Sequence, residues 1–197
     1  MVLREGDVHP DPFVQFAHWY DEAVTAIGED ADHMVVATAD LDGGPSARVV
    51  LLRGFDEKGF CFYTNYESRK GRELAVNPRA ALLLHWTALH RQVRITGAVG
   101  RLDPSESERY WRNRPRASQL SAWASRQSET VPSRASLEAE VERLALRFGD
   151  DVPPPSFWGG YRVAPSDFEF WEHRDDRLHD RLRYRIADGW VVERLAP

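Results

Sequence analysis

Strand-like segments in this sequence follow one another directly, with tight turns and not helices between them, and this order constrains the fold more than any other feature. Between residues 33 and 64, the sequences Asp42-Gly43-Gly44-Pro45 and Asp56-Glu57-Lys58-Gly59 separate apolar segments rich in β-branched residues. This arrangement predicts an antiparallel meander. The predicted strands are His33–Ala39, Ala47–Arg53, which we expect to be buried, and Phe60–Thr64.

The rest of the chain continues the pattern. Further strands are predicted at Ala80–Trp86, Gln92–Arg101, Asp167–Glu172, Leu182–Ile186 and Trp190–Leu195. Asp188-Gly189 is a predicted hairpin turn, and Trp158-Gly159-Gly160 is also predicted to be a turn. Capping residues followed by apolar residues at helical spacing predict helices at Asp11–Ala26, Ser68–Val76, Asp103–Asn113, Ala117–Ser125 and Ser133–Phe148.

About eight strands in consecutive runs, with four or five helices, favour a mainly β fold of the α+β type. We expect a closed or nearly closed antiparallel β-barrel with peripheral helices. No internal repeat or linker divides the sequence, so a single domain over residues 1–197 is predicted, with residues 1–10 as a flexible N-terminus.

The charge balance argues against a nucleic-acid partner. The chain has 26 Lys+Arg against 31 Asp+Glu, a net charge of −5, whereas nucleic-acid affinity rests largely on basic residues. No apolar run approaches the roughly 20 residues of a membrane span, and residues 1–11 lack the basic and apolar regions of a signal peptide. The single cysteine, Cys61, cannot form an intramolecular disulfide. We therefore expect a cytoplasmic protein that binds neither nucleic acid nor membranes.

Basic residues nevertheless gather locally, which fits small anionic ligands, although solvated surface arginines are the alternative interpretation. The clusters are Arg48–Arg53, Arg69–Arg72, Arg109–Arg116 and Arg174–Arg185. The sequence has no glycine-rich phosphate loop, no zinc-binding spacing of His and Cys and no G-x-S-x-G elbow. A Rossmann or P-loop nucleotide site, a metal site and a serine hydrolase are therefore not indicated.

Four stretches together resemble the pyridoxine/pyridoxamine 5'-phosphate oxidase family, whose members have the FMN-binding split-barrel fold. They are Arg48 to Arg53; Phe62 to Asn65 with Ser68 to Lys70; Arg114 to Gln119 through Ser125 to Ser128; and Arg177 to Arg181 with Arg194 to Pro197. Ser156 to Gly160 lies between the last two. The resemblance covers the chain from about Asp11 to Pro197, and it implies a homodimer with FMN at the interface.

The resemblance implies a set of FMN contacts. It assigns the cofactor phosphate to Arg48, Arg69 and Lys70, since an arginine offers a planar fork and a lysine a point charge to phosphate oxygens. Cations at a helix N-terminus are unfavourable unless an anion binds there, which favours a phosphate site at Ser68-Arg69-Lys70. The other implied FMN contacts are Val49, Val50, Leu51, Arg53, Tyr63, Thr64, Gln92, Gln127, Ser128, Trp171 and Arg181, some of them reaching across the dimer.

The same resemblance assigns the substrate phosphate to Tyr110, Arg114 and Ser118, with Arg53 on the substrate side. Their spacing of four and four would place the three on one helical face, but Pro115 favours a helix end followed by a turn.

Arg177 and His179 are the implied catalytic and substrate-binding residues beside the substrate ring. In a strand-like segment, Arg177, His179 and Arg181 would share a face and could point into one pocket. Two flanking arginines would then disfavour a charged His179, so we expect that histidine to be neutral.

The implied function is an FMN-dependent oxidase that makes pyridoxal 5'-phosphate from pyridoxine 5'-phosphate or pyridoxamine 5'-phosphate, with O2 as acceptor and H2O2 as product. The chain departs from the family at Arg53, where lysine is usual, and at Met1–Pro10, which is shorter and more acidic than the usual basic arm. Two alternatives stay open. One is a related split-barrel flavin oxidase of the phenazine-pathway type acting on another ring, which Arg53 favours. The other is a non-enzymatic FMN- or pyridoxal-phosphate-binding module, against which the retained substrate-side residues argue.

Overall fold

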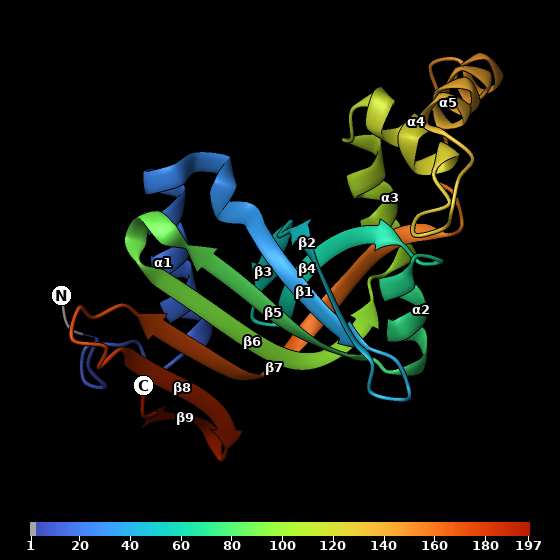
Figure 1. Cartoon of the computed structure of the whole chain (residues 1–197). Coiled ribbons are helices and arrows are strands. Elements are labelled where there is room, and N and C mark those ends of the chain that lie inside the picture. The colour runs from blue at the N-terminus through green and yellow to red at the C-terminus, as the bar shows by residue number, and fades with distance from the viewer. Residues whose placement is uncertain (1–2) are drawn as a thin grey trace.

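Nine antiparallel strands form one strongly curled sheet, which is the core of the molecule (Figure 1). The computed structural model describes residues 3–197. Along the main path the strands run in the order β2-β1-β5-β6-β7-β4-β3, and β8 and β9 extend the sheet from β7. The strands are β1 (His33–Ala39), β2 (Pro45–Leu51), β3 (Gly54–Asp56), β4 (Gly59–Asn65), β5 (Arg79–Trp86), β6 (Arg91–Arg101), β7 (Trp158–Glu172), β8 (Asp180–Ala187) and β9 (Gly189–Arg194).

β7 is the strand on which the sheet divides. Its first part pairs with β4, its last part pairs with β8, and β6 pairs with nearly its whole length. The register with β6 shifts between Thr96 and Gly97, and a side chain at Gly97 would meet the backbone oxygen of Ala164. Bulges of this kind bend a strand, which lets one strand serve both halves of an antiparallel split barrel.

Five α-helices lie around the sheet: α1 (Pro12–Ile27), α2 (Arg69–Val76), α3 (Pro104–Arg112), α4 (Arg116–Ala124) and α5 (Arg134–Phe148). The predicted caps are confirmed where they matter most for the site. Ser68 accepts a hydrogen bond from Gly71 N–H at the start of α2, and Asp103 caps α3 ahead of Pro104. α3, α4 and α5 form a lobe that projects from the barrel (Figure 1).

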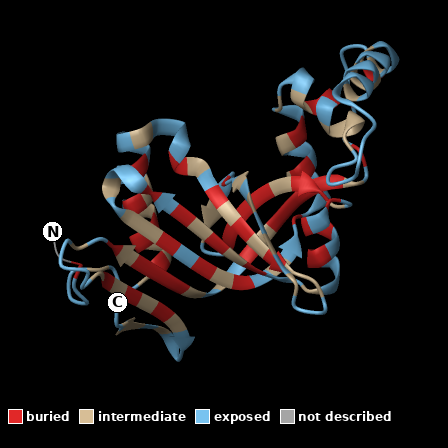
Figure 2. Cartoon of the chain, viewed as in Figure 1, coloured by how far each residue is buried: buried red, intermediate tan, exposed pale blue. Residues whose placement is uncertain are grey.

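Two hydrophobic clusters stabilise the barrel and the helical lobe. The larger fills the barrel and takes in α1, whose Phe16 is fully buried and meets Phe60 edge to face. Figure 2 shows this buried side of the strands. The smaller joins the lobe to the start of β7 and contains Trp111, Leu120 and Trp158. The site described below therefore lies between two separately packed bodies.

The expected barrel with peripheral helices is confirmed, but three local predictions are wrong. The sequence Trp158-Gly159-Gly160 is no turn; it begins β7 and pairs with Asn65, Thr64 and Tyr63 of β4. Glycine is needed at residue 159 because a side chain there would meet the Tyr66 hydroxyl. The second strand is not buried: Val49 of β2 is 62% exposed, since β2 ends the sheet path and borders the cleft. The third concerns residues 177–179, taken up with the site.

The N-terminal segment, expected to be flexible, packs on the C-terminal strands over the part that is described, residues 3–10. Leu3 is buried, and its N–H donates to the Asp180 carboxylate at 3.3 Å. Arg194 of β9 binds the Leu3 carbonyl and pairs with Glu5 at 2.7 Å. Met1 and Val2 lie outside the described residues. Among residues 3–197, no helix combines the length and apolar character needed to cross a bilayer.

Candidate active site

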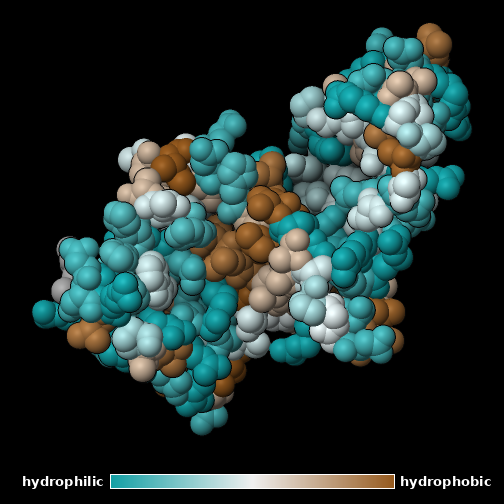
Figure 3. Space-filling model, viewed as in Figure 1, coloured by the Kyte–Doolittle hydropathy of each residue, from teal (hydrophilic) through white to brown (hydrophobic). Residues whose placement is uncertain are grey.

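An open cleft of about 1290 Å³ lies between the barrel and the helical lobe. In Figure 3 the surface is hollowed between these two bodies, beside an apolar patch. The cleft exceeds the roughly 300–1,000 Å³ of common small-molecule sites. Fourteen residues predicted for the site line it: Arg48, Val49, Val50, Leu51, Arg53, Tyr63, Thr64, Arg69, Lys70, Tyr110, Arg114, Ser118, Gln127 and Ser128.

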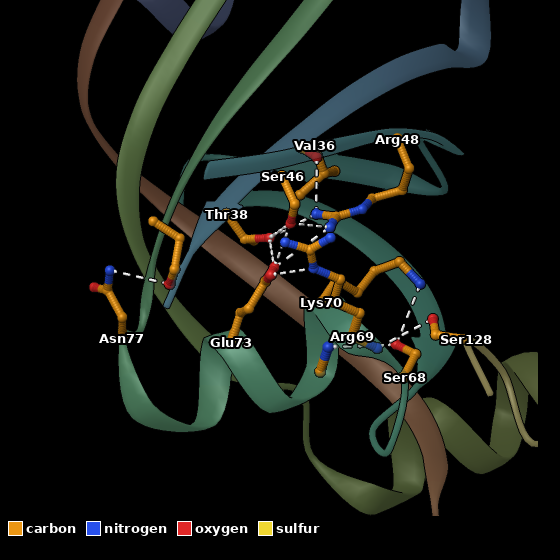
Figure 4. Close-up of polar contacts among 12 residues, drawn as sticks. Val36, Thr38, Ser46, Arg48, Ser68, Arg69, Lys70, Glu73, Asn77 and Ser128 are labelled. Carbon is orange, nitrogen blue, oxygen red and sulfur yellow. Dashed lines mark hydrogen bonds and ion pairs between the residues drawn. The ribbon is translucent and has the colours of Figure 1, made fainter. Parts of the chain in front are cut away.

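One end of the cleft is a cationic cluster organised around a buried carboxylate, Glu73 (Figure 4). Glu73 Oε1 accepts a hydrogen bond from Arg69 Nε at 2.8 Å, and Oε2 lies 3.3 Å from Arg48 Nη2. Ser46 and Thr38 hydroxyls also donate to Oε2. Burial alone would raise the pKa of Glu73, but these hydrogen bonds hold it at about 2, so the side chain is ionised at neutral pH.

Lys70 is the second buried charge at this end, and it has only neutral hydrogen-bond partners. Its Nζ donates to Thr64 Oγ1 at 2.8 Å, to Gln127 Oε1 at 2.7 Å and to Ser68 Oγ at 3.3 Å. Burial, and then the charge of Arg48, lowers the pKa of Lys70 to about 8. A buried ammonium without a carboxylate on it favours an incoming anion, because an anion compensates its lost solvation.

The N-terminus of α2 lies at the same end of the cleft. The Arg69 N–H donates to Ser128 Oγ at 3.1 Å, which ties the loop after α4 to this helix. Gly71 permits the close turn, since a side chain there would lie 2.1 Å from the Tyr66 carbonyl oxygen. The helix dipole and the adjacent cations together favour an anion at this end, although the N–H groups of Arg69 and Gly71 are already paired with Ser128 and Ser68.

An aromatic wall carries another cation of the cleft, Arg114. Tyr63 of β4 and Tyr110 of α3 stack at 3.8 Å between ring centroids, and Trp158 continues the stack at 5.5 Å from Tyr63. The Arg114 guanidinium lies 4.8 Å from the Trp158 ring and 5.2 Å from the Trp111 ring.

Arg114 is incompletely paired. Within the described chain its Nη1 is buried and has no hydrogen-bond partner, and burial lowers the pKa of this guanidinium. Because such an unpaired buried donor costs about 1–3 kcal/mol or more, this atom is a ready point of attachment for a ligand oxygen. As expected, Pro115 separates α3 from α4, so Tyr110, Arg114 and Ser118 reach the cleft from a helix, a turn and a second helix.

Arg53 reaches the cleft from the end of β2 and is held from behind. Its Nη1 pairs with Asp32 Oδ2 at 3.2 Å, and the other carboxylate oxygen accepts from the Tyr20 hydroxyl. Burial, and then the hydrogen bond to Asp32, raises the pKa of Tyr20 to about 12, so the phenol stays a donor. The guanidinium therefore has a fixed position that a free surface arginine lacks.

Five predicted site residues do not line this cleft: Gln92, Trp171, Arg177, His179 and Arg181. Gln92 and Trp171 are cross-strand partners where β6 begins and β7 nears its end, and Trp171 also pairs with Arg181. Because Trp158 begins β7, these residues lie toward the opposite end of that strand.

The strand-like prediction for residues 177–179 is wrong. Arg177 lies in a turn with φ of 64°, and β8 begins only at Asp180. His179 Nδ1 accepts the Arg174 N–H at 3.0 Å, so this nitrogen carries no proton. Arg181 turns to the buried Glu169 at 2.8 Å. The alternation that would have aimed Arg177, His179 and Arg181 at one pocket therefore does not exist within this segment.

The structure also brings residues to the site that were not predicted. Glu73, Asp32 and Trp158 are the most consequential. The spacing of four residues between Arg69 and Glu73 is the helical ion-pair spacing and could have indicated their contact. Asp32 carries no comparable signal, because it meets Arg53 only through the fold. Other cleft residues outside the predicted set are Ser46, Ala47, Asn65, Asn113, Pro115, Ala117, Ser121, Ala122 and Ser125.

Comparisons with known proteins show the family to which the chain belongs. Residues 20–148 match the family model described as pyridoxamine 5'-phosphate oxidase, and residues 158–197 match the pyridoxine 5'-phosphate oxidase C-terminal dimerisation region. The chain is 52% identical over 198 residues to the pyridoxine/pyridoxamine 5'-phosphate oxidase of Cupriavidus taiwanensis, covering 100% of this chain and 93% of that relative. The same-named protein of Burkholderia cenocepacia is 51% identical over 99% of this chain and 93% of its own. The chain therefore belongs to the pyridoxine/pyridoxamine 5'-phosphate oxidase family.

Solved structures confirm the split-barrel fold. PhzG from Burkholderia lata 383, determined in complex with tetrahydrophenazine-1-carboxylic acid, superposes with a TM-score of 0.92 at 35% identity, covering 100% of this chain and 98% of PhzG. A pyridoxamine 5'-phosphate oxidase-related, FMN-binding protein from Nostoc punctiforme has a TM-score of 0.74 at 17% identity, covering 95% and 98% of the two chains, and it supports the fold alone.

Proposed function

We propose that this protein is an FMN-dependent oxidase that converts pyridoxine 5'-phosphate or pyridoxamine 5'-phosphate to pyridoxal 5'-phosphate. The alcohol or amine carbon of the substrate loses two electrons, and O2 accepts them to give H2O2. With the amine substrate, water then hydrolyses the imine product and releases ammonia. The names of relatives about half identical over nearly the whole chain support this reaction.

The observation that carries the proposal is the unpaired Nη1 of Arg114 in a cleft that has a second cationic centre at Arg48, Arg69 and Lys70. One phosphate cannot account for both. FMN and a phosphorylated substrate each bring one, and the aromatic wall between Tyr63 and Trp158 provides an apolar boundary for ring systems.

The residues present fit FMN by their donor chemistry. Lys70 and the α2 N-terminus would hold its phosphate together with Arg48 and Arg69. FMN, when bound, would supply the redox chemistry: it can accept a hydride from the substrate and pass the electrons to O2. Thr64 and Gln127, already paired to Lys70, would orient that side of the cofactor.

On the substrate side, Arg114, Tyr110 and Ser118 would bind the phosphate, and Arg53 would approach from β2. Their task is to hold the substrate ring in line for hydride loss, since orientation alone contributes a large part of such a rate. The remaining candidates, among them Arg177, His179 and Trp171, would come from a second copy of the chain. The match of residues 158–197 to a dimerisation region supports a homodimer of this kind.

An anaerobic half-reaction tests the proposal. The FMN-loaded protein is mixed with pyridoxine 5'-phosphate without oxygen, and the visible flavin absorbance is followed. We expect the flavin absorbance to bleach and to return when air is admitted. The Arg114→Gln variant should bleach equally fast only at a much higher substrate concentration. A wild-type spectrum unchanged by both pyridoxine and pyridoxamine 5'-phosphates would contradict the substrate assignment.

The second candidate is an oxidase acting on a carboxylated tricyclic ring. The likeness to PhzG at a TM-score of 0.92 favours it, as does arginine at residue 53. The unpaired Nη1 of Arg114 could donate to a carboxylate as well as to a phosphate. Flavin bleaching by a reduced phenazine carboxylate, with no response to the B6 phosphates, would select this candidate.

A further inference from the structure

The carboxylate of Glu73 is the sole acidic partner that the described contacts give to the cationic end of the cleft. Its side chain is only 6% exposed, and its oxygens receive hydrogen bonds from two strands and one helix. Arg48 pairs with it from β2 and Arg69 from α2. The same two arginines are the ones proposed to hold the cofactor phosphate.

The balance of charge at this end is unequal. Arg48, Arg69 and Lys70 carry three positive charges, and Glu73 offsets one. The excess of two positive charges equals the charge of a phosphate monoester dianion. Without any anion, three cations would gather in one partly buried place, where mutual repulsion is only weakly screened.

We propose that Glu73 is an internal counter-anion that stands in for the cofactor phosphate while the cleft is empty, and that it stabilises the cofactor-free protein while reducing its affinity for FMN. The inference rests on the proposed FMN site. The Glu73 carboxylate is buried and held by Arg48, Arg69 and two hydroxyls, whereas the Arg69 side chain is 59% exposed, so we expect the carboxylate to stay in place and to repel an arriving phosphate. The same charge that makes the empty site tolerable therefore weakens binding.

Glu73→Gln tests this directly, because the amide carries no charge and its one oxygen can still accept from the Ser46 and Thr38 hydroxyls, while its NH2 group replaces the oxygen that accepts from Arg69. We expect the thermal midpoint of the cofactor-free variant to fall by at least about 3 °C, which corresponds to roughly 1 kcal/mol for a chain of this size. FMN binding, followed by quenching of flavin fluorescence, is expected to strengthen by about tenfold at low salt and to gain a steeper salt dependence.

A charge-compensated variant shows whether Glu73 acts through its negative charge or only through its hydrogen bonds. Arg69→Gln/Glu73→Gln restores the excess of two positive charges. We expect it to be more stable without FMN than Glu73→Gln alone. Glu108→Gln removes an exposed helical ion pair with Arg112, away from the cleft, and serves as the matched control that should leave both measurements unchanged.

Several results would overturn the inference. These are weaker FMN binding in Glu73→Gln, an unchanged thermal midpoint, or a double variant no more stable than the single one. If the single variant cannot be isolated without ligand, inorganic phosphate is titrated during purification. If phosphate stabilises the single variant at concentrations that do not affect the wild type, the result supports Glu73 as a counter-anion. If neither phosphate nor the second substitution restores a stable protein, the result contradicts the inference. A protein that binds FMN as described but oxidises no B6 phosphate leaves this inference intact and refutes only the substrate assignment.

Discussion

Tyr63 and Tyr110 stack with their ring planes 5° from parallel and their centroids 3.8 Å apart, although one lies on a barrel strand and the other on a helix of the lobe. The pair therefore joins the two bodies that form the cleft. Stacked aromatic pairs contribute about 0.5–1.5 kcal/mol beyond their buried area, so the stack also fixes where the Tyr110 hydroxyl lies.

Tyr110→Phe keeps this stack and removes the hydroxyl. We expect the KM for pyridoxine 5'-phosphate to rise by about tenfold or more, since a hydrogen bond to a charged group is worth roughly 1.5–3 kcal/mol, with the thermal midpoint unchanged. Tyr110→Ala should also lower the midpoint, because it breaks the contact between barrel and lobe. Steady-state kinetics and calorimetry on the two variants make the comparison, and an unchanged KM in Tyr110→Phe would remove the hydroxyl from the phosphate site.

The depressed pKa of Lys70 predicts how FMN affinity depends on pH. A phosphate binds the protonated lysine, so its binding raises the lysine pKa above the value of about 8 in the free protein. Affinity should be highest well below pH 8, fall as pH rises through about 8, and level off above the raised pKa of the complex. Flavin fluorescence quenching between pH 7 and 9.5 measures this.

Lys70→Arg is the control for that profile. An arginine keeps its proton throughout this range, so the variant should have a flat profile whatever its absolute affinity. Equal slopes in wild type and variant would show that another group titrates.

Asp32 should matter through Arg53. Asp32→Asn removes the charge that fixes the guanidinium, and we expect a KM increase of several-fold for pyridoxine 5'-phosphate with kcat nearly constant. A partly exposed pair contributes only about 0–1 kcal/mol to stability, so the fold should be barely affected. In an Arg53→Gln background the same substitution should have no further effect on KM. Tyr20→Phe, which leaves the Arg53–Asp32 pair in place, is the matched control.

Arg177→Ala should cut turnover by roughly a hundredfold, the scale of losing a charge-stabilising group at a reacting centre, while FMN binds with unchanged affinity. Arg183 lies within β8 and pairs with Asp167 outside the cleft, so Arg183→Ala should retain activity. Stopped-flow flavin reduction at saturating substrate distinguishes them. Near-normal rates in Arg177→Ala would exclude a catalytic role for this residue.

Local chemistry explains what could be predicted from the sequence. The turns between residues 39 and 60, the Ser68 cap and the Asp188-Gly189 hairpin depend on neighbouring residues, and each was predicted within a few positions. The start of β7 could not be predicted in this way, because glycines at residues 159 and 160 are typical of turns. Glycine is needed there because Tyr66 and Leu102, from other parts of the chain, pack closely against the strand.

The same limit applies to the site. Residues contributed by contiguous motifs, such as Arg48 to Leu51 with Arg53, were placed at the cleft by resemblance, and they line it. The Asp32–Arg53 contact depends on two segments meeting in three dimensions. Arg177 and His179 do not line the cleft of one chain, so their place in the site rests on the proposed homodimer.

β7 has a consequence for inheritance. The strand begins in the cleft at Trp158 and reaches Trp171 after roughly 40 Å of extended backbone, so Arg114 and Arg177 belong to different halves of the protein. In a homodimer in which both copies contribute to each site, one allele with Arg114 substituted and another with Arg177 substituted would each lose a different one of the two contributions. A cell with both alleles still assembles one intact site in every mixed pair, so two recessive defects in one gene would complement each other.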